Sequence, residues 1–336
     1  MKAAVIEQHG GAGTIAIDNA FADPKPGAED VIIKVGASSL NYHDVFTRNG
    51  MPGIKVPMPC IMGLDFAGEI VEVGSDVKDW KVGQRVLIDP VDRVGPGGLI
   101  GEMWHGGLAE FCKVPTHHLV SLPDNVSFED AACLPVAYGT ALRMMYTIGN
   151  VQAGEKVLVL GASGGVGTCS VLLAKARGCE VIACASSQSK LDRLKDLGAD
   201  HGINYVDEDF MKWVWTNFGK PHRRQFDKGV DCVVNFTGGD TWVPSLRVLH
   251  RGGRVLTCGA TAGFDPKEDL RFIWSYELKV LGANGWLREE LETLVSMLSD
   301  GSLKPVIDKV LPLEDVNEAF RLLEDREVFG KVVLTP

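Results

Sequence analysis

The stretch "LVLGASGGVGTCS", residues 158–170, contains a glycine-rich turn between a predicted strand and a predicted helix. Such a turn places a dinucleotide pyrophosphate at the N-terminus of the helix. In the G-x-G-x-x-G register the three positions are Ala162, Gly164 and Gly167. Alanine is tolerable at the first position, which serves the turn, whereas the second lets the backbone approach phosphate and the third lets the helix pack on the strand. The residues predicted to contact the cofactor here are Ala162, Ser163, Gly164, Gly165, Val166 and Gly167.

Strands and helices alternate from residue 127 onward, which favours a parallel sheet covered by helices on both faces. Apolar runs typical of strands occur at residues 180–186, 229–238, 252–260 and 278–286. Ser127 followed by Asp130 is close to a capping box, and it begins one predicted helix over residues 127–149.

Residues 1–120 show a different pattern, with short β-branched runs bounded by glycine and proline turns. Examples are "DVIIKVGASSL" at 30–40 and "QRVLIDP" at 84–90. The stretch "GPGGLIGEMWHGG", residues 95–107, predicts a long loop. We expect this half to be all-β, and residues 288–336 to add two helices and a closing strand.

Composition excludes several classes of protein. The chain has 336 residues, of which 45% are hydrophobic and 23% charged, and this length suits two domains. The net charge of −10 argues against nucleic-acid or anionic-membrane partners. No signal peptide or membrane span is expected. The eight cysteines form no C-x-x-C pair, so we expect buried free thiols in a cytoplasmic protein.

The residues after the second predicted strand of the parallel sheet indicate which dinucleotide binds. An NAD site carries an acid there, but this chain has Ser186 and Ser187, followed by Lys190. Two hydroxyls and a cation suit a 2′-phosphate, so NADPH/NADP⁺ is the predicted cofactor. In the alternative interpretation, the serines cap a helix and the lysine is a solvated side chain.

Six motifs in order resemble the medium-chain dehydrogenase/reductase superfamily, and within it the zinc-lacking quinone-oxidoreductase-like group. They are "LNYHDVFTRNG" (40–50), "GLDFAGEIVEVG" (63–74), "GGLAEF" (106–111), "AYGTAL" (137–142), "GASGGVG" (161–167) and "FGKVVL" (329–334). The resemblance implies an α/β fold with a GroES-like β-rich catalytic domain (1–127 and 288–336) and a Rossmann domain (128–287). It also implies a homodimer joined through the Rossmann sheets.

The resemblance adds cofactor-contacting residues that the glycine turn does not predict. They are Thr140, Tyr205, Asn235, Gly259, Asn284 and Lys331. Most fall where strands are expected to end, and ligands of such sheets bind at the carboxyl ends of the strands.

Zinc-binding members of this superfamily hold catalytic zinc with a cysteine, the histidine of a G-H-E triplet and a later cysteine. Here Asn41 and Leu64 stand at the first two positions, and Ala132 is near the third, with Cys133 beside it. Leucine cannot bind a metal, and asparagine is a poor zinc ligand. Four closely spaced cysteines between about residues 88 and 105, which would hold structural zinc, are missing too. We therefore expect no metal; the alternative is an improvised site formed from His43, Asp65 or Cys133.

Without zinc, reduction of an activated alkene or a quinone is easier than oxidation of an alcohol, because conjugation delocalises the developing charge. The predicted catalytic residues are Asn41, Tyr42, His43 and Asp65. The first three can hydrogen-bond an enolate or deliver a proton, and Asp65 could orient His43. Equally, each could be structural. The expected substrate is a small quinone, enone, enal or enoyl thioester, and the sequence does not say which.

Other polar and aromatic residues near these motifs favour structural roles. Arg48 could clamp substrate, but an internal ion pair, perhaps with Asp44, is the stronger interpretation; His105 is expected to be a loop residue. Trp242, Trp274 and Trp286 could shape a pocket or simply provide buried bulk. Two alternative functions remain: a zinc-free alcohol or carbonyl dehydrogenase, and a non-catalytic NADPH-binding sensor or structural protein.

Overall fold

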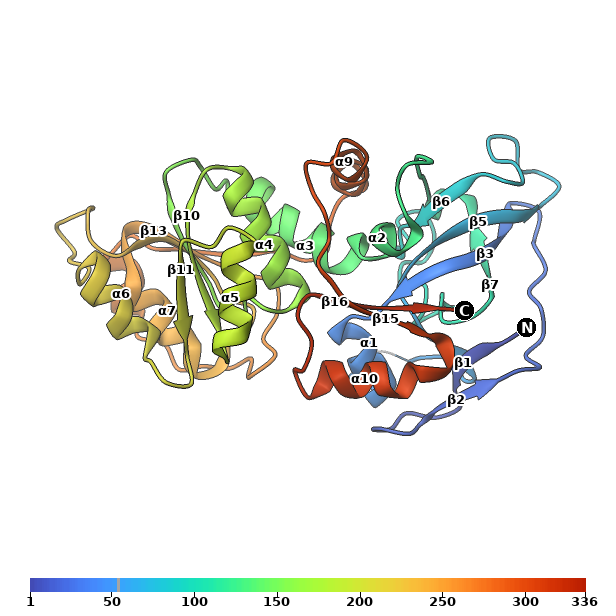
Figure 1. Ribbon diagram of the computed structural model, residues 1–336, viewed down its shortest axis with the longest axis horizontal. Helices are drawn as coiled ribbons and strands as arrows, with labels where there is room; N and C mark the ends of the chain where they lie inside the picture. Colours follow the sequence, from blue (N-terminus) through green and yellow to red (C-terminus); the bar gives the residue numbers. More distant parts are fainter. Residues whose placement is uncertain (53–54) are drawn as a thin grey trace. The chain divides into compact units, whose positions relative to one another are not determined.

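A computed structural model describes residues 1–52 and 55–336 (Figure 1). These residues form two compact units, one of Met1–Ala137 with Arg288–Pro336 and the other of Tyr138–Leu287. The first junction therefore lies later than the sequence-based boundary at residue 127. Among the described helices, none has both the length and the apolar character needed to cross a membrane.

The unit Tyr138–Leu287 is built on a parallel sheet with the order β11-β10-β9-β12-β13-β14. Numbered within the unit, this is the Rossmann order 3-2-1-4-5-6. The strands are β9 (Lys156–Val159), β10 (Glu180–Ala185), β11 (His201–Asn204), β12 (Val230–Val234), β13 (Leu249–Thr257) and β14 (Lys279–Gly282). Burial of β9, β10 and β12 along nearly their whole length explains their continuous apolar sequences. The predicted α/β fold is confirmed.

Helices cover this sheet. They are α3 (Thr140–Leu142), α4 (Gly165–Ala176), α5 (Gln188–Asp196), α6 (Phe210–Phe218), α7 (Trp242–Val248) and α8 (Leu270–Ser275). Helices α4 and α5 pack against β9, β10 and β11, whereas α7 packs against β13 (Figure 1). The crossover from β9 through α4 to β10 is the unit that carries the glycine turn.

The other unit contains a larger sheet of order β15-β16-β3-β5-β6-β8, with β7 paired to β3, and a smaller sheet of order β2-β1-β4. The larger sheet comprises β3 (Asp30–Ser39), β5 (Asp65–Val73), β6 (Arg85–Ile88), β7 (Phe111–Pro115), β8 (Leu119–Ser121), β15 (Ile307–Pro312) and β16 (Lys331–Thr335). The smaller one comprises β1 (Ala3–Ile6), β2 (Ile15–Asp18) and β4 (Cys60–Ile61). The helices of this unit are α1 (Tyr42–Asn49), α2 (Phe128–Ala132), α9 (Arg288–Ser299) and α10 (Val316–Glu324). Since β16 pairs with β3, the end of the chain lies beside its first half.

Helix α1 contradicts the expectation that residues 1–120 are all-β. The Asp44 carboxylate accepts a hydrogen bond from the Asn41 backbone N–H at 2.8 Å, and the helix ends at Gly50 with φ of 90°. A helix of about two turns has too few apolar repeats to stand out between strands.

The helix predicted over residues 127–149 begins as expected but is not regular. Ser127 Oγ accepts from the Asp130 N–H at 3.1 Å and caps α2. Beyond α2, a π-helical segment Leu134–Gly139 intervenes before α3, and a second one follows at Arg143–Ile148. Pro135 has no N–H to donate, and the N–H of Val136 donates to the Asp65 side chain instead.

Candidate active site

The glycine turn leaves the N-terminus of α4 open. Gly164 is the N-cap of α4, and no side chain caps the helix. The N–H groups of the first helical turn have no partner within the helix, so they can bind an anion. A Cβ on Gly164 would meet nothing closer than Gly161 O at 3.6 Å, whereas one on Gly167 would lie 2.3 Å from that oxygen. The helix and turn therefore fit a dinucleotide pyrophosphate.

The residue that makes the tight turn is not the one expected. Gly161 has φ of 61°, in the left-handed region that favours glycine. Ala162 is fully buried, and its N–H donates to Cys184 O at 3.0 Å. A glycine one position earlier thus supplies the turn.

The residues predicted to bind the 2′-phosphate follow neighbouring strands. Ala185 pairs with Asn204 at the ends of β10 and β11, so Ser186 and Tyr205 follow the same edge of the sheet. Tyr205 is 46% exposed. Ser187 caps α5, accepting from the Lys190 N–H at 3.4 Å, as the alternative interpretation held. The acid of an NAD site is missing because a serine follows β10.

Three further predicted cofactor residues also follow strand ends: Asn235 after β12, Gly259 after β13 and Asn284 after β14. Asn235 is fully buried, and its Oδ1 accepts from the N–H groups of Thr237 and Gly238 at 2.9 Å each. Its side chain therefore shapes the loop after β12. Thr140 is buried in α3 of the same unit, but Lys331 belongs to the other unit.

A buried polar network lies in the β-rich unit, which comprises Met1–Ala137 and Arg288–Pro336. It is formed by Asn41, Asp65 and Lys331. Lys331 Nζ donates to Asn41 Oδ1 at 2.5 Å and Leu40 O at 2.8 Å, and lies 3.5 Å from Asp65 Oδ2. Asn41 Nδ2 donates to Asp65 Oδ2 at 2.8 Å. Burial raises the pKa of Asp65, and the charge of Lys331 and the hydrogen bonds offset this only in part. The network thus holds one ammonium and one carboxylate away from water.

His43 pairs with Glu102 rather than with Asp65, so the predicted orienting residue was wrong. His43 Nε2 lies 2.6 Å from Glu102 Oε2, and the side chains are 28% and 5% exposed. Burial alone would lower the pKa of His43, but the hydrogen bond to Glu102 and nearby carboxylate charges raise it. The sequence analysis did not identify Glu102 as a site residue, because it comes close to His43 only through the path of its loop. The one sign in the sequence was a single acidic residue within a glycine-rich loop.

Two other residues of α1 flank this histidine. Burial raises the pKa of Asp44 to about 6, and its Oδ1 has no hydrogen-bond partner. Tyr42 makes an edge-to-face contact with Phe46, with ring centroids 5.4 Å apart. The carboxyl of Asp44 can therefore gain a proton near neutral pH.

The side chains at the zinc-ligand positions of the superfamily do not fit catalytic zinc. Leu64 is buried and has no ligand atom. Asn41 Oδ1 already binds an ammonium, whose charge would repel a dication. Cys133 Sγ donates to Glu129 O at 3.2 Å, and burial raises the pKa of this thiol to about 12. The three groups proposed for an improvised site are thus engaged with different partners.

Arg48 forms an ion pair, but its partner is Glu324 at 2.6 Å rather than Asp44. Its side chain is 1% exposed and lies over the ring of Phe320. His105 is a loop residue whose Nδ1 accepts from Ile61 N at 3.2 Å. Trp286 is buried, Trp242 is half-buried and Trp274 is 65% exposed.

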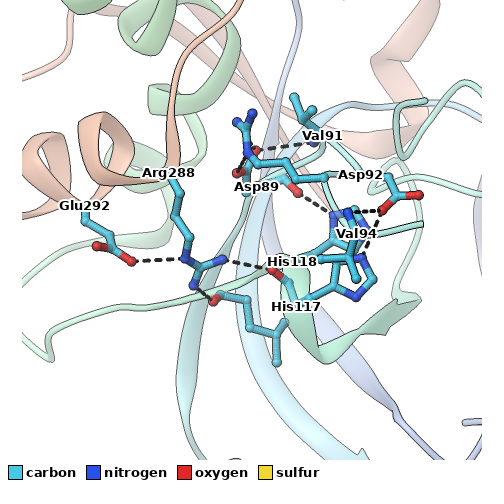
Figure 2. A network of polar contacts seen from close by, with 10 residues as sticks. Asp89, Val91, Asp92, Val94, His117, His118, Arg288 and Glu292 are labelled. Atoms are coloured by element: carbon cyan, nitrogen blue, oxygen red, sulfur yellow. Dashed lines mark hydrogen bonds and ion pairs between the residues drawn. The ribbon is translucent and has the colours of Figure 1, made fainter. Parts of the chain in front are cut away.

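Asp92, His117 and His118 bring three possible metal ligands together in the β-rich unit (Figure 2). The Asp92 carboxylate accepts from backbone N–H groups, the strongest from Gly95, and these bonds hold its pKa at about 2. The histidine ring centroids are 4.3 Å apart at an interplanar angle of 36°. A metal lies near the plane of each imidazole it binds, at about 2 Å from the nitrogen. In this structure His117 Nε2 instead lies 3.2 Å from Asp92 Oδ1, a contact within the protein.

The same cluster belongs to a network that anchors α9. Arg288 donates to His117 O at 2.9 Å and to Leu119 O, and its Nε pairs with Glu292 (Figure 2). His118 Nδ1 lies 2.7 Å from Asp89 O. We therefore interpret the cluster as structural, because it ties the returning chain to β8.

Comparisons with known proteins agree with this fold. Residues 27–124 match the model "Alcohol dehydrogenase GroES-like domain", and residues 197–334 match "Zinc-binding dehydrogenase". Acryloyl-coenzyme A reductase of Sulfurisphaera tokodaii is 32% identical over 94% of each chain. Quinone oxidoreductase of Rattus norvegicus is 28% identical over 99% of this chain and 97% of the rat protein.

A crystal structure of an NAD-dependent alcohol dehydrogenase superposes with a TM-score of 0.91 and 34% identity, covering 100% of both chains. The relatives thus include reductases and alcohol dehydrogenases. The matched domains, the Rossmann strand order and the glycine turn agree. The chain belongs to the medium-chain dehydrogenase/reductase superfamily, a family of oxidoreductases that bind a nicotinamide cofactor.

Proposed function

We propose that the protein is an NADPH-dependent reductase that transfers a hydride to an activated C=C bond or to a quinone, without catalytic zinc. The observation that carries the proposal is the ammonium of Lys331 bonded to Asn41, at the position of the first zinc ligand of the superfamily. Alcohol oxidation depends on a Lewis acid that stabilises the alkoxide. A conjugated carbonyl or a quinone spreads the developing charge by itself.

The Rossmann unit would hold the cofactor. The open N–H groups at the start of α4 would bind the pyrophosphate, and Ser186, Lys190 and Tyr205 would contact the 2′-phosphate. Bound NADPH supplies the hydride. A serine instead of an acid after β10 removes the charge repulsion that a 2′-phosphate would otherwise meet.

The β-rich unit would supply the polar groups that stabilise the negative charge formed on the substrate by hydride transfer. Asn41 has a second amide hydrogen besides the one bonded to Asp65, and Tyr42 has a hydroxyl. His43 has a raised pKa and is partly exposed, so it can carry a proton at neutral pH and recover one from water. These groups can stabilise an enolate oxygen and protonate the product.

The relatives support this proposal and one alternative. Acryloyl-coenzyme A reductase and quinone oxidoreductase, by their names, act on an activated C=C bond and on a quinone. The similarity to an NAD-dependent alcohol dehydrogenase favours instead a zinc-free alcohol or carbonyl dehydrogenase. The buried polar network of Asn41, Asp65 and Lys331 favours the reductase over this alternative, because its side chains include no Lewis acid that would stabilise an alkoxide.

A substrate panel tests the proposal. Purified protein is assayed for NADPH oxidation with quinones, enones, enals and enoyl thioesters, and for NADP⁺ reduction with alcohols; NADH is run in parallel. We expect turnover with at least one activated alkene or quinone, unchanged by a chelator, and no stoichiometric zinc by metal analysis. Activity with alcohols alone, or about one tightly bound zinc per chain, would overturn it. Cofactor binding without turnover on any substrate would favour a sensor or structural protein.

We also propose a homodimer formed through the edge of the Rossmann sheet. Strand β14 is the terminal strand of the described sheet, and Val280 on it is 44% exposed. Leu270 and Trp274 of the preceding α8 are 63% and 65% exposed. An open edge with apolar neighbours favours pairing with a second copy. Light scattering should give twice the chain mass, and Val280→Glu should give monomers.

A further inference from the structure

Glu102 places a carboxylate directly on the imidazole of His43. The side chain of Glu102 is 5% exposed, and Oε2 lies 2.6 Å from His43 Nε2. A buried carboxylate is costly without a hydrogen-bond donor, preferably a charged one. In the part of the chain that the structure describes, His43 is the donor that meets this carboxylate. The pair is therefore held together by the burial of Glu102.

The backbone around Glu102 fixes where its side chain can lie. Gly101 has φ of 84°, and a Cβ there would lie 2.6 Å from Gly63 O. A Cβ on Gly106 would lie 2.3 Å from the same oxygen. Glycines thus let both sides of the loop pack directly on the backbone before β5. Since α1 carries His43, the two partners come from separate, closely packed segments.

The other ring nitrogen of His43 is available for chemistry. Among residues 1–52 and 55–336, no protein group bonds to His43 Nδ1. With Nε2–H donating to Glu102, a neutral ring has its lone pair on Nδ1, and a charged ring has a second proton there. Because the side chain is 28% exposed, water can reach it.

We propose that Glu102 is the positioning residue of His43: it fixes Nε2–H on its carboxylate and so makes Nδ1–H the proton donor to the reduced substrate. This inference rests on the proposed reductase function. Hydride addition forms a C–H bond at the β-carbon, and the alkene electron pair moves onto the carbonyl oxygen as an enolate. The enolate α-carbon then takes the proton from His43 Nδ1, and the C=O bond forms again. The ring is left neutral, still donating to Glu102, and water returns a proton to Nδ1.

Charges around His43 support a protonated ring before the reaction. Glu102 from the loop, Asp44 from α1 and Asp65 from β5 all act on it, and together they raise its pKa against the effect of burial. Lys331 lies within the same network and partly balances Asp65. Burial, and to a smaller extent the charge of Glu102, raises the pKa of the Cys60 thiol in β4 to about 12. The thiol therefore stays neutral, and the ring carries the mobile proton.

The test compares Glu102→Gln, which removes the charge, with Glu102→Asp, which keeps it. On the best activated alkene, Glu102→Gln should lower kcat about 10–100-fold with little change in substrate KM. The alkaline limb of the kcat profile should move to lower pH, and Glu102→Asp should restore part of both. Glu110→Gln is the matched control, because Glu110 bonds to the Lys2 N–H and does not act on His43.

Histidine NMR titration measures the pair without turnover. Signals of His43 are assigned with His43→Gln, and their midpoint should fall in Glu102→Gln but not in Glu110→Gln. An unchanged midpoint, or a loss of activity with an unmoved pH limb, would overturn the positioning role. If wild type reduces no activated alkene or quinone while the midpoint still shifts, the proposed function fails and the pairing holds. Melting curves and NADPH binding confirm that each variant is folded.

Discussion

The glycine turn of residues 161–167 and the buried polar network of Asn41, Asp65 and Lys331 hold their groups in different ways. The turn uses backbone N–H groups from one continuous segment, and the space around each Cβ position limits which residues fit there. The network uses side chains from residues 41, 65 and 331, and its stability depends on the pairing of buried charges. A local site can therefore be changed one residue at a time, whereas the network responds as a unit.

Lys331→Met should have the largest effect. It leaves the Asp65 carboxylate buried without a cation, which typically costs about 3–5 kcal/mol. Urea unfolding of the variant measures this loss. The double variant with Asp65→Asn should recover most of it, because it removes the uncompensated charge. If Lys331→Met instead keeps its stability but binds NADPH weakly, Lys331 is a cofactor contact, as the resemblance implied. The distinction between a local cofactor turn and a structural charge network would then be wrong.

Within the turn, Gly167→Ala should destabilise the Rossmann unit. Its Cβ would lie 2.3 Å from Gly161 O, a backbone atom that cannot move aside easily. We expect a loss of about 2–3 kcal/mol in thermal or urea unfolding. Gly164→Ala is the matched variant: its Cβ has room in the protein, so stability should change by less than about 0.5 kcal/mol.

The two glycine variants should separate folding from binding. Gly164→Ala places a methyl group where the pyrophosphate approaches, so NADPH affinity, followed by fluorescence, should fall about tenfold or more. Equal stability losses in the two variants, or full NADPH affinity in Gly164→Ala, would contradict this division of roles.

Lys190→Ala should affect only one form of the cofactor. Loss of a charge-assisted bond to a phosphate costs about 1.5–3 kcal/mol, or roughly 10–100-fold in the KM for NADPH. The KM for NADH should hardly change. The backbone N–H that Ser187 caps stays in place, so α5 should remain intact. Lys195→Ala, an exposed lysine on the same helix, is the control; equal effects on both cofactors would count against the assignment.

The smallest expected effect is on the pH dependence of stability. The pKa of His43 is raised in the folded protein. Its pairing with Glu102 therefore contributes stability that is fully present below the ordinary histidine pKa of about 6.5. This contribution is lost as pH rises through the higher folded value. Wild type should exceed Glu102→Gln by about 1.5 kcal/mol more at pH 6 than at pH 9. Stability curves that run parallel across this range would show that the pair carries no charge-dependent stabilisation.

Local patterns predicted much of the fold correctly. The apolar run before the turn, the glycines and the following strands led to the Rossmann sheet, and Ser127 marked the start of α2. The replacement of the metal-binding histidine by Leu64 was readable without any structure. Long-range pairings could not be predicted: Arg48 bonds to Glu324 and His43 bonds to Glu102. The sequence had suggested Asp44 for Arg48, and for Asp65 it left an orienting role toward His43 and a structural role equally open.

The sequence by itself determined the dinucleotide turn, the class of fold and the absence of the family's zinc ligands, because each depends on which residue types stand in local motifs and not on which distant side chains meet. The tertiary structure decided which groups meet around α1. Lys331 reaches Asn41 because β16 pairs with β3, and Glu102 reaches His43 because its loop packs on the backbone at Gly63. Such contacts depend on strand pairing and loop paths, which hydrophobic periodicity does not encode.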